Sequence, residues 1–207
     1  MIKTIIKIGK DKKIFFLPEN WLEIKLKHLI NLELWQGDSS DPVGLLACFL
    51  QIDPDIIGNS KKDYWTELLT LLNFVFNAPK WHNLKIPDTV FLDNRSIKVP
   101  KRLEMERFGQ KVVCLQYMAS MKQDNIALIP DVMAVYFQPL IDGKFNRNRI
   151  EYVKRLIMDM PAIEAVPIGR FFFRKLLKSK TLGRLGLRRS RLIRSVKLNS
   201  AQPAAVS

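Results

Sequence analysis

Apolar residues near the start of the chain alternate with polar ones, which is the pattern of a β-strand with one buried face. Ile2–Ile8 shows this alternation, and residues 13–17 are apolar and aromatic. The four residues between the two segments have turn chemistry, so the pattern predicts an N-terminal β-hairpin. A second small hairpin is possible at Thr89–Leu92 and residues 96–99, because Asp93-Asn94 between them favours a turn.

Most of the remaining chain has apolar residues three or four positions apart, the spacing that gives a helix one buried face. The most regular example is residues 62–77, whose apolar stripe includes Trp65 and Leu72. Asp41 and Pro42 have the residue types of a helix N-cap and first turn. Helices are predicted at residues 18–30, 43–50, 62–77, 110–121, 131–138, 147–160 and 162–178. The predicted fold class is therefore α+β, with a mainly α-helical body.

A length of 207 residues suits one globular domain with a tail, or two small domains. Hydrophobic residues make up 47% of the chain, which is enough for a sizeable core. We predict a globular, mostly helical domain at residues 1–169. A basic amphipathic extension at residues 170–198 and a frayed tail at residues 199–207 are expected to follow it.

The formal net charge of +14 is concentrated at the C-terminal end. Residues 170–207 contain eleven Lys or Arg and no Asp or Glu, so the first 169 residues carry only 23 basic against 20 acidic side chains. Such asymmetry indicates an anionic partner. The residues predicted to bind nucleic acid or another anionic partner are Arg170, Arg174, Lys175, Lys178, Lys180, Arg184, Arg188, Arg189, Arg191, Arg194 and Lys197.

Apolar residues interrupt the basic segment, and at helical spacing they would occupy the face opposite most of the arginines. Gly183 and Gly186 each cost about 1 kcal/mol within a helix, so the free segment is expected to order on binding. The residues predicted to face a partner with their apolar side chains are Phe171, Phe172, Phe173, Leu182, Leu185, Leu192, Ile193 and Val196.

Four interpretations of this segment stay open from the sequence. Contact with nucleic acid would be dominated by phosphates and sensitive to salt. Contact with a membrane surface, the less favoured option, would place the leucines and phenylalanines in the lipid interface. Contact with a protein would bury the apolar face in a groove. A charged helix packed on its own domain would bind nothing.

Little in the sequence indicates catalysis, and no enzyme activity, metal or cofactor is expected. His28 and His82 are the only histidines, and neither has metal-ligand spacing to another candidate ligand. Asp88 and Asp93 are similar to the spaced carboxylates of metal-dependent nucleases, but position 95 is Arg where those enzymes place a lysine. Two turn-forming aspartates explain the same residues, so a nuclease is the third option.

Compartment signals point away from secretion and membrane insertion. Cys48 and Cys114 lie in apolar segments 66 positions apart, which favours two buried, reduced thiols. The apolar stretch after Met1 is short and interrupted by lysines, so no signal peptide is predicted. The longest charge-free apolar stretch, residues 68–79, is about half of the roughly 20 residues that a membrane span needs.

Several short segments resemble a group of small proteins from tailed bacteriophages and prophages of Bacteroidetes, crAss-like phages among them. The segments are Leu17-Pro18-Glu19-Asn20-Trp21-Leu22-Glu23-Ile24, Arg107-Phe108-Gly109-Gln110, Met133-Ala134-Val135-Tyr136-Phe137-Gln138-Pro139, Phe145-Asn146 and Phe171-Phe172-Phe173. They are short and aromatic and are spread thinly over residues 1–175. The basic extension beyond Lys175 departs from the compact members of the group, which favours a protein that touches DNA or a large assembly.

The resemblance implies a virion-associated or tail-assembly role through protein–protein contacts, without catalytic residues. The expected partners are other phage structural proteins, or the chain itself as a homo-oligomer, and the C-terminal segment could add contact with DNA. The expected location is the virion, or the bacterial host cytoplasm during assembly. The alternative function is a nucleic-acid-binding accessory protein, in which the basic segment itself is the functional part.

Overall fold

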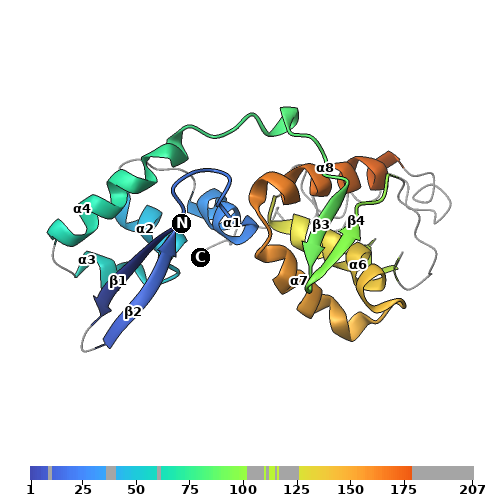
Figure 1. Ribbon diagram of the computed structural model, residues 1–207, viewed down its shortest axis with the longest axis horizontal. Helices are drawn as coiled ribbons and strands as arrows, with labels where there is room; N and C mark the ends of the chain where they lie inside the picture. Colours follow the sequence, from blue (N-terminus) through green and yellow to red (C-terminus); the bar gives the residue numbers. More distant parts are fainter. Residues whose placement is uncertain are drawn as a thin grey trace, which may run out of the picture.

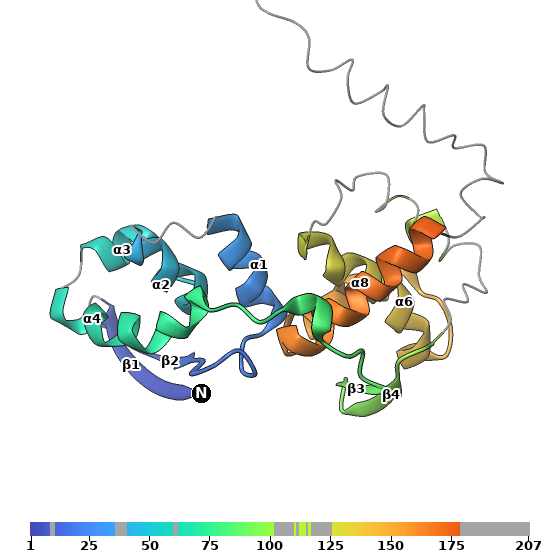
Figure 2. The same ribbon diagram turned by 90° about the horizontal axis from the view of Figure 1, so that it is seen from above.

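The computed structural model describes residues 1–8, 11–35, 41–59, 62–101, 110, 112–114, 116 and 126–178. These residues form a mostly helical body with two small antiparallel hairpins, which confirms the predicted α+β class (Figure 1). Figures 1 and 2 show two lobes, which we call the N-lobe (residues 1–76) and the C-lobe (residues 89–178). Their buried side chains belong to one hydrophobic core.

The N-lobe starts with the predicted hairpin. Strands β1 (Ile2–Ile8) and β2 (Asp11–Leu17) pair antiparallel in a register that runs from Ile2↔Leu17 to Ile8↔Asp11. Successive side chains in a strand point to opposite faces. One face of the hairpin buries Leu17 and half-buries Phe15, and β2 contacts the neighbouring helix α2 (Pro42–Leu50).

Helix α1 (Leu26–Trp35) begins eight residues later than predicted. The main chain before it pairs with the C-lobe instead of forming a helical turn. The amide of Leu26 donates to the carbonyl oxygen of Met160 (2.8 Å), and the amide of Ala162 donates to that of Ile24 (2.7 Å). Pairing with a distant segment therefore overrides the local helical pattern in residues 18–25.

Helix α2 begins as the sequence predicts. Asp41 Oδ1 accepts a hydrogen bond from the amide of Gly44 (2.8 Å), and Asp41 Oδ2 accepts one from Trp35 Nε1 at the end of α1 (3.0 Å). The short helix α3 (Pro54–Gly58) begins in the same way, with Asp53 accepting from the amide of Asp55 (3.0 Å). One aspartate at each start satisfies an amide that a helix leaves without an internal partner.

The regular helix predicted at residues 62–77 is divided. Helix α4 (Lys62–Leu71) continues as the 3₁₀ helix η1 (Leu72–Phe76). Trp21 donates from Nε1 to the carbonyl oxygens of Phe74 (3.1 Å) and Asn77 (2.9 Å), two acceptors that a continuing α-helix would have used itself. Leu72 is fully buried as predicted, but the tighter turn leaves Phe76 exposed.

The C-lobe contains the second predicted hairpin, β3 (Thr89–Leu92) and β4 (Arg95–Lys98). Asp93 and Asn94 between them both have positive φ angles, 52° and 57°. Two consecutive residues in the left-handed region match the twist of a tight hairpin, and Asn and Asp tolerate this region better than most residues. A short 3₁₀ helix, η2 (Trp81–Asn83), lies on the connection between the lobes.

Helix α6 (Ile129–Asp142) is the centre of the C-lobe, and nearly all of its residues are buried. Helices α7 (Ile150–Met158) and α8 (Ala162–Lys178) both pack against it, and 3₁₀ helices η3 (Ile126–Leu128) and η4 (Arg147–Arg149) precede α6 and α7. Of the helix predicted at residues 110–121, Gln110, residues 112–114 and Gln116 are helical, and the rest lies outside the described residues.

The two lobes meet at α1, which contacts both α7 and α8 (Figure 2). Lys25 Nζ and Lys27 Nζ lie 3.1 and 3.0 Å from Asp159 Oδ1, beside the main-chain pairing of Lys25 with Pro161. Within the described residues no single helix is long and apolar enough to cross a membrane. The only combination of sufficient length, η3–α6 with η4–α7, is bent by 112°.

Candidate functional site

The basic segment begins on α8, the last helix of the body. Arg170 is half-buried, and Arg174 and Lys175 are exposed. Lys175 Nζ lies 5.6 Å from the centroid of the Phe171 ring, within range of a cation–π contact. The boundary predicted after Gly169 falls inside α8, so the body continues through Lys178.

The other predicted binding residues lie outside the described residues. They are Lys180, Arg184, Arg188, Arg189, Arg191, Arg194 and Lys197 on the charged side, and Leu182, Leu185, Leu192, Ile193 and Val196 on the apolar side.

The prediction that Phe172 faces a partner is wrong. Its side chain is fully buried, and its ring centroid lies 4.6 Å from that of Tyr136 and 5.9 Å from that of Phe137, both on α6. Phe171 and Phe173 are half-buried and pack at the margin of the same core. Three consecutive residues on a helix point in directions about 100° apart, so they cannot all face outward.

A different apolar surface lies on the outward side of the β1–β2 hairpin. Ile5 and Ile14 are cross-strand partners there, and their residues are 49% and 53% exposed. Phe16, two positions from Ile14 and on the same face, is 56% exposed. The apolar pattern of the sequence predicts the strands but does not single out this face, because alternation alone does not tell which side the body covers.

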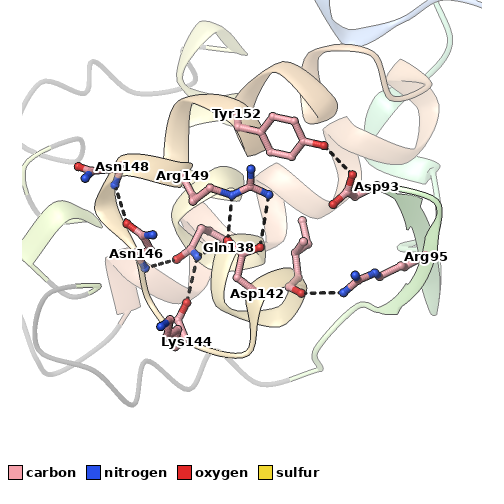
Figure 3. Close-up of polar contacts among 10 residues, drawn as sticks. Asp93, Arg95, Gln138, Asp142, Lys144, Asn146, Asn148, Arg149 and Tyr152 are labelled. Atoms are coloured by element: carbon pink, nitrogen blue, oxygen red, sulfur yellow. Dashed lines mark hydrogen bonds and ion pairs between the residues drawn. The ribbon is translucent and has the colours of Figure 1, made fainter.

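A polar network ties the second hairpin to α6 and α7 (Figure 3). Gln138 is fully buried at the end of α6, where Nε2 donates to Asp142 Oδ2 (2.8 Å) and to the Lys144 carbonyl oxygen (3.0 Å). Its Oε1 accepts from the amide of Asn146 (2.7 Å). All of these contacts shape the turn that leads from α6 into α7.

The same network continues to the hairpin turn. Arg149 Nε donates to Asp142 Oδ2 (3.3 Å), and its guanidinium carbon lies 4.1 Å from the centroid of the Tyr152 ring. Tyr152 donates its hydroxyl to Asp93 Oδ1 (2.6 Å), while Arg95 donates to the carbonyl oxygen of Ile141 (3.1 Å). The turn between β3 and β4 is therefore held to α6 and α7 from both ends.

These contacts shift the ionisation of the groups involved. The hydrogen bond from Gln138, followed by that from Arg149, lowers the pKa of Asp142 below its ordinary value. The hydrogen bond to Asp93 raises the pKa of Tyr152. The carboxylate of Asp142 and the phenol of Tyr152 are thus already engaged by neighbouring side chains. We therefore assign the network a structural role, which is to hold the hairpin turn on α6 and α7.

A shallow pocket of about 440 Å³ lies beside the network, where the hairpin turn meets the end of α7. It is lined by Phe91, Leu92, Asp93, Asn94, Tyr152, Leu156, Asp159, Met160 and Pro161. Its two carboxylates already have partners, Tyr152 for Asp93 and two lysines for Asp159. The chemistry of the lining therefore selects no particular ligand class.

The residues considered for nuclease chemistry do not converge. Asp88 is exposed, and its Oδ1 lies 3.5 Å from Lys101 Nζ at one end of the β3–β4 ladder, whereas Asp93 accepts a hydrogen bond from Tyr152 at the other end. The part of the chain that the structure describes contains no group of three His, Cys, Asp or Glu side chains placed to hold a metal ion.

The histidines and cysteines divide by burial. His82 is exposed, whereas His28 is buried on α1, and burial lowers its pKa to about 4. Cys114 is buried and Cys48 half-buried, and both are free thiols. Burial raises their pKa values to about 12 and about 11 respectively, which keeps both protonated and unreactive at neutral pH.

Comparison of the chain with protein-family models, with curated proteins and with solved structures gives no match. The surfaces described above are therefore the basis for a functional proposal, together with the resemblance seen in the sequence.

Sequence reasoning missed the polar network and the outward face of the first hairpin. Gln138 and Asp142 are four residues apart on one helix, which is a usable local signal for a contact. Tyr152 and Asp93 are 59 residues apart, and no local pattern brings them together. For the hairpin, the signal that could have been used is the presence of Ile or Phe on both faces of one ribbon.

Proposed function

We propose that this chain is a non-catalytic phage structural or assembly protein that acts through protein–protein contacts. Its basic C-terminal segment contacts DNA or an acidic partner surface, and its partners are other phage structural proteins or further copies of itself. The location that follows is the virion, or the bacterial host cytoplasm during assembly. The resemblance to small proteins of tailed phages supports this proposal.

The observation that carries the proposal is the anchoring of α8. Phe172 fixes the helix in the core, while Arg174 and Lys175, on the next turn, are exposed. The described start of the basic segment thus has a fixed position on the body. A body that docks and a charged segment that binds nearby reinforce each other, because the second contact forms at high effective concentration.

A nucleic-acid-binding accessory protein is the second candidate, favoured by the eleven cations from Arg170 onward. The two candidates differ in assembly state. An assembly protein is expected to form an oligomer, or a complex with a co-expressed product of a neighbouring gene, in size-exclusion chromatography with light scattering. A chain that stays monomeric with every such product, yet shifts DNA, would favour the accessory role. Mg²⁺-dependent loss of DNA would instead reveal a nuclease.

Removing residues 179–207 is expected to leave the body folded, because the periodic apolar faces that the sequence predicts to form the core lie upstream of this segment. Thermal melts of the full-length and truncated proteins should nearly coincide. A truncated protein that no longer unfolds cooperatively would show that the leucines of the segment complete the core. The segment would then be part of the body and not a binding element.

The basic segment should bind duplex DNA mainly through charge. If about five phosphates are engaged, the slope of log K against log salt should be near −4 to −5. Changing Arg184, Arg188 and Arg191 to Ala should flatten the slope by about three, since each arginine releases about one counterion. Changing Leu185 and Leu192 to Ser is the matched control and should leave DNA binding nearly intact. If the leucine changes abolish DNA binding and the arginine changes do not, the segment does not bind DNA mainly through charge.

A further inference from the structure

The outward face of the β1–β2 hairpin places apolar side chains at its centre. The register contains seven cross-strand pairs, and the middle one is Ile5↔Ile14. Phe16 belongs to the next pair on the same face, toward the base of the hairpin. All three residues are about half exposed, so a large part of each side chain is accessible to solvent. We call this surface the ribbon face.

The ribbon face is not needed to complete the core. The opposite side of the hairpin already buries Leu17 and half-buries Phe15 against the body. Single exposed apolar residues are ordinary on protein surfaces. Neighbouring ones on an ordered element more often mark a contact with another molecule, especially where polar residues surround them. Ile5, Ile14 and Phe16 form such a group.

The charge on the ribbon face identifies the kind of partner. The described charged side chains at its register positions are those of Lys3 and Lys12, which are both exposed, and no acidic side chain among the described ones shares this face. We propose that the ribbon face docks a partner protein whose contact surface is apolar at its centre and acidic at its rim. This inference rests on the proposed assembly role and names the class of partner that role requires.

A second copy of the chain fits this face poorly. If two ribbon faces packed against each other, the lysines of one copy would lie against the lysines of the other copy. Among the described side chains, neither face has a carboxylate to offset this repulsion. An anionic lipid surface also fits less well. Three half-exposed side chains offer less apolar area than a single myristoyl chain, which by itself binds membranes only marginally. At a protein interface the same three side chains are enough to form the central anchor.

The test uses the full chain and a defined probe, an amphipathic helical peptide with a leucine stripe flanked by glutamates. A helix that lays an apolar stripe on a sheet face is a common packing arrangement. The charge-reversed peptide, with lysines in place of glutamates, is the control probe. Hydrogen exchange is read at β1 and β2, so binding of the acidic peptide to the C-terminal basic segment does not enter the measurement.

The acidic peptide is expected to slow exchange in β1 and β2, and the basic peptide is not. The double variant Lys3→Glu with Lys12→Glu should weaken the acidic peptide's binding at this site at least tenfold and favour the basic peptide. Ile14→Ser should weaken binding of the acidic peptide when it is made in the parent chain. It should weaken binding of the basic peptide when it is made in the double variant. Leu34→Ser, at an exposed position on α1, is the matched control and should change nothing.

Three results would overturn the inference. They are equal protection by both peptides or by neither, protection by phosphatidylglycerol vesicles in place of the peptide, and dimerisation that Ile14→Ser abolishes. The proposed function is judged separately, from complex formation with co-expressed proteins. If the chain forms a complex with a co-expressed protein but the acidic peptide does not protect β1 and β2, the ribbon face is not the docking surface that we propose. The proposed assembly role would still stand.

Discussion

Acidification should destabilise this protein through His28. The side chain is buried on α1, its ring centroid lies 5.5 Å from that of Phe49, and Nδ1 has no hydrogen-bond partner among the described residues. Burial is the main cause that lowers the pKa of His28 from 6.5 to about 4, and the charges of Lys27 and Lys25 add to it, while Asp159 opposes them. Protonation would place an unpaired charge in the core beside two lysines.

The size of the effect follows from the two pKa values. The ordinary pKa of His28 is 6.5, and the folded value is about 4. The unfolded chain therefore takes up a proton first as the pH falls, so the free energy of unfolding decreases between pH 6.5 and 4. At about 1.36 kcal/mol per pKa unit the full loss is about 3 kcal/mol. Roughly 2 kcal/mol of it is expected by pH 5.

The assay is urea denaturation at several pH values between 7 and 4, with His28→Phe as the test variant. Phenylalanine fits the aromatic contact with Phe49 and cannot be protonated, so the variant should lose less stability on acidification than the parent chain. Carboxylates with shifted pKa values that do not act on His28, such as Glu33 and Glu164, titrate in both proteins, and their effects cancel in the difference. His82→Phe, at an exposed position, is the matched control.

The reasoning is refuted if the parent chain and His28→Phe lose the same stability between pH 6.5 and 4. That result would mean that His28 is hydrated or paired in the folded state, so that its proton affinity changes little on folding. If only His82→Phe loses the pH dependence of the free energy of unfolding, the exposed His82 and not His28 is its cause.

Two further predictions concern packing, and chemical denaturation tests both. Gly169→Ala should destabilise the protein by about 1–3 kcal/mol, because a Cβ at this position would lie 2.6 Å from Ile129 Cγ2. Gly58→Ala is the control and should have little effect, because nothing lies within 4 Å of a Cβ there. Equal effects of the two changes would disprove the close approach of α8 to α6. Leu72→Ala should cost about 2–5 kcal/mol, and Phe76→Ala, at an exposed position, much less; a cost below 1 kcal/mol for Leu72→Ala would show that Leu72 is not a core residue.

Local sequence was sufficient for both hairpins and for the start of α2. In β1–β2 and β3–β4 the apolar pattern predicts the strands, although β2 begins at Asp11, two residues earlier than predicted. In β3–β4, Asp93 and Asn94 adopt the left-handed conformation that the tight turn needs. Asp41 caps α2 because its side chain reaches an amide three residues away. In each case the stabilising contact lies within a few residues, so a short stretch of sequence contains all of the information.

Tertiary contacts decided the elements on which the local pattern failed. Residues 18–25 have a helical pattern, yet their main chain pairs with the segment around Pro161, and Trp21 takes two acceptors at η1. Phe172 belongs to a basic, aromatic segment that looks like a binding surface, but α6 supplies rings for it to pack on. No local pattern contains these partners, which lie more than 30 positions away in the chain.

The two candidate surfaces show the same division. The sequence alone determines that eleven cations follow Gly169 without an acidic residue, because charge is a property of composition. Strand alternation also places Ile14 and Phe16 on one face of β2, whereas the pairing of Ile5 with Ile14 depends on the strand register, which the structure shows. Only the tertiary structure decides that this face points to solvent and that its opposite lies on the body. Burial depends on which element packs against a strand, and that choice is made by the whole chain.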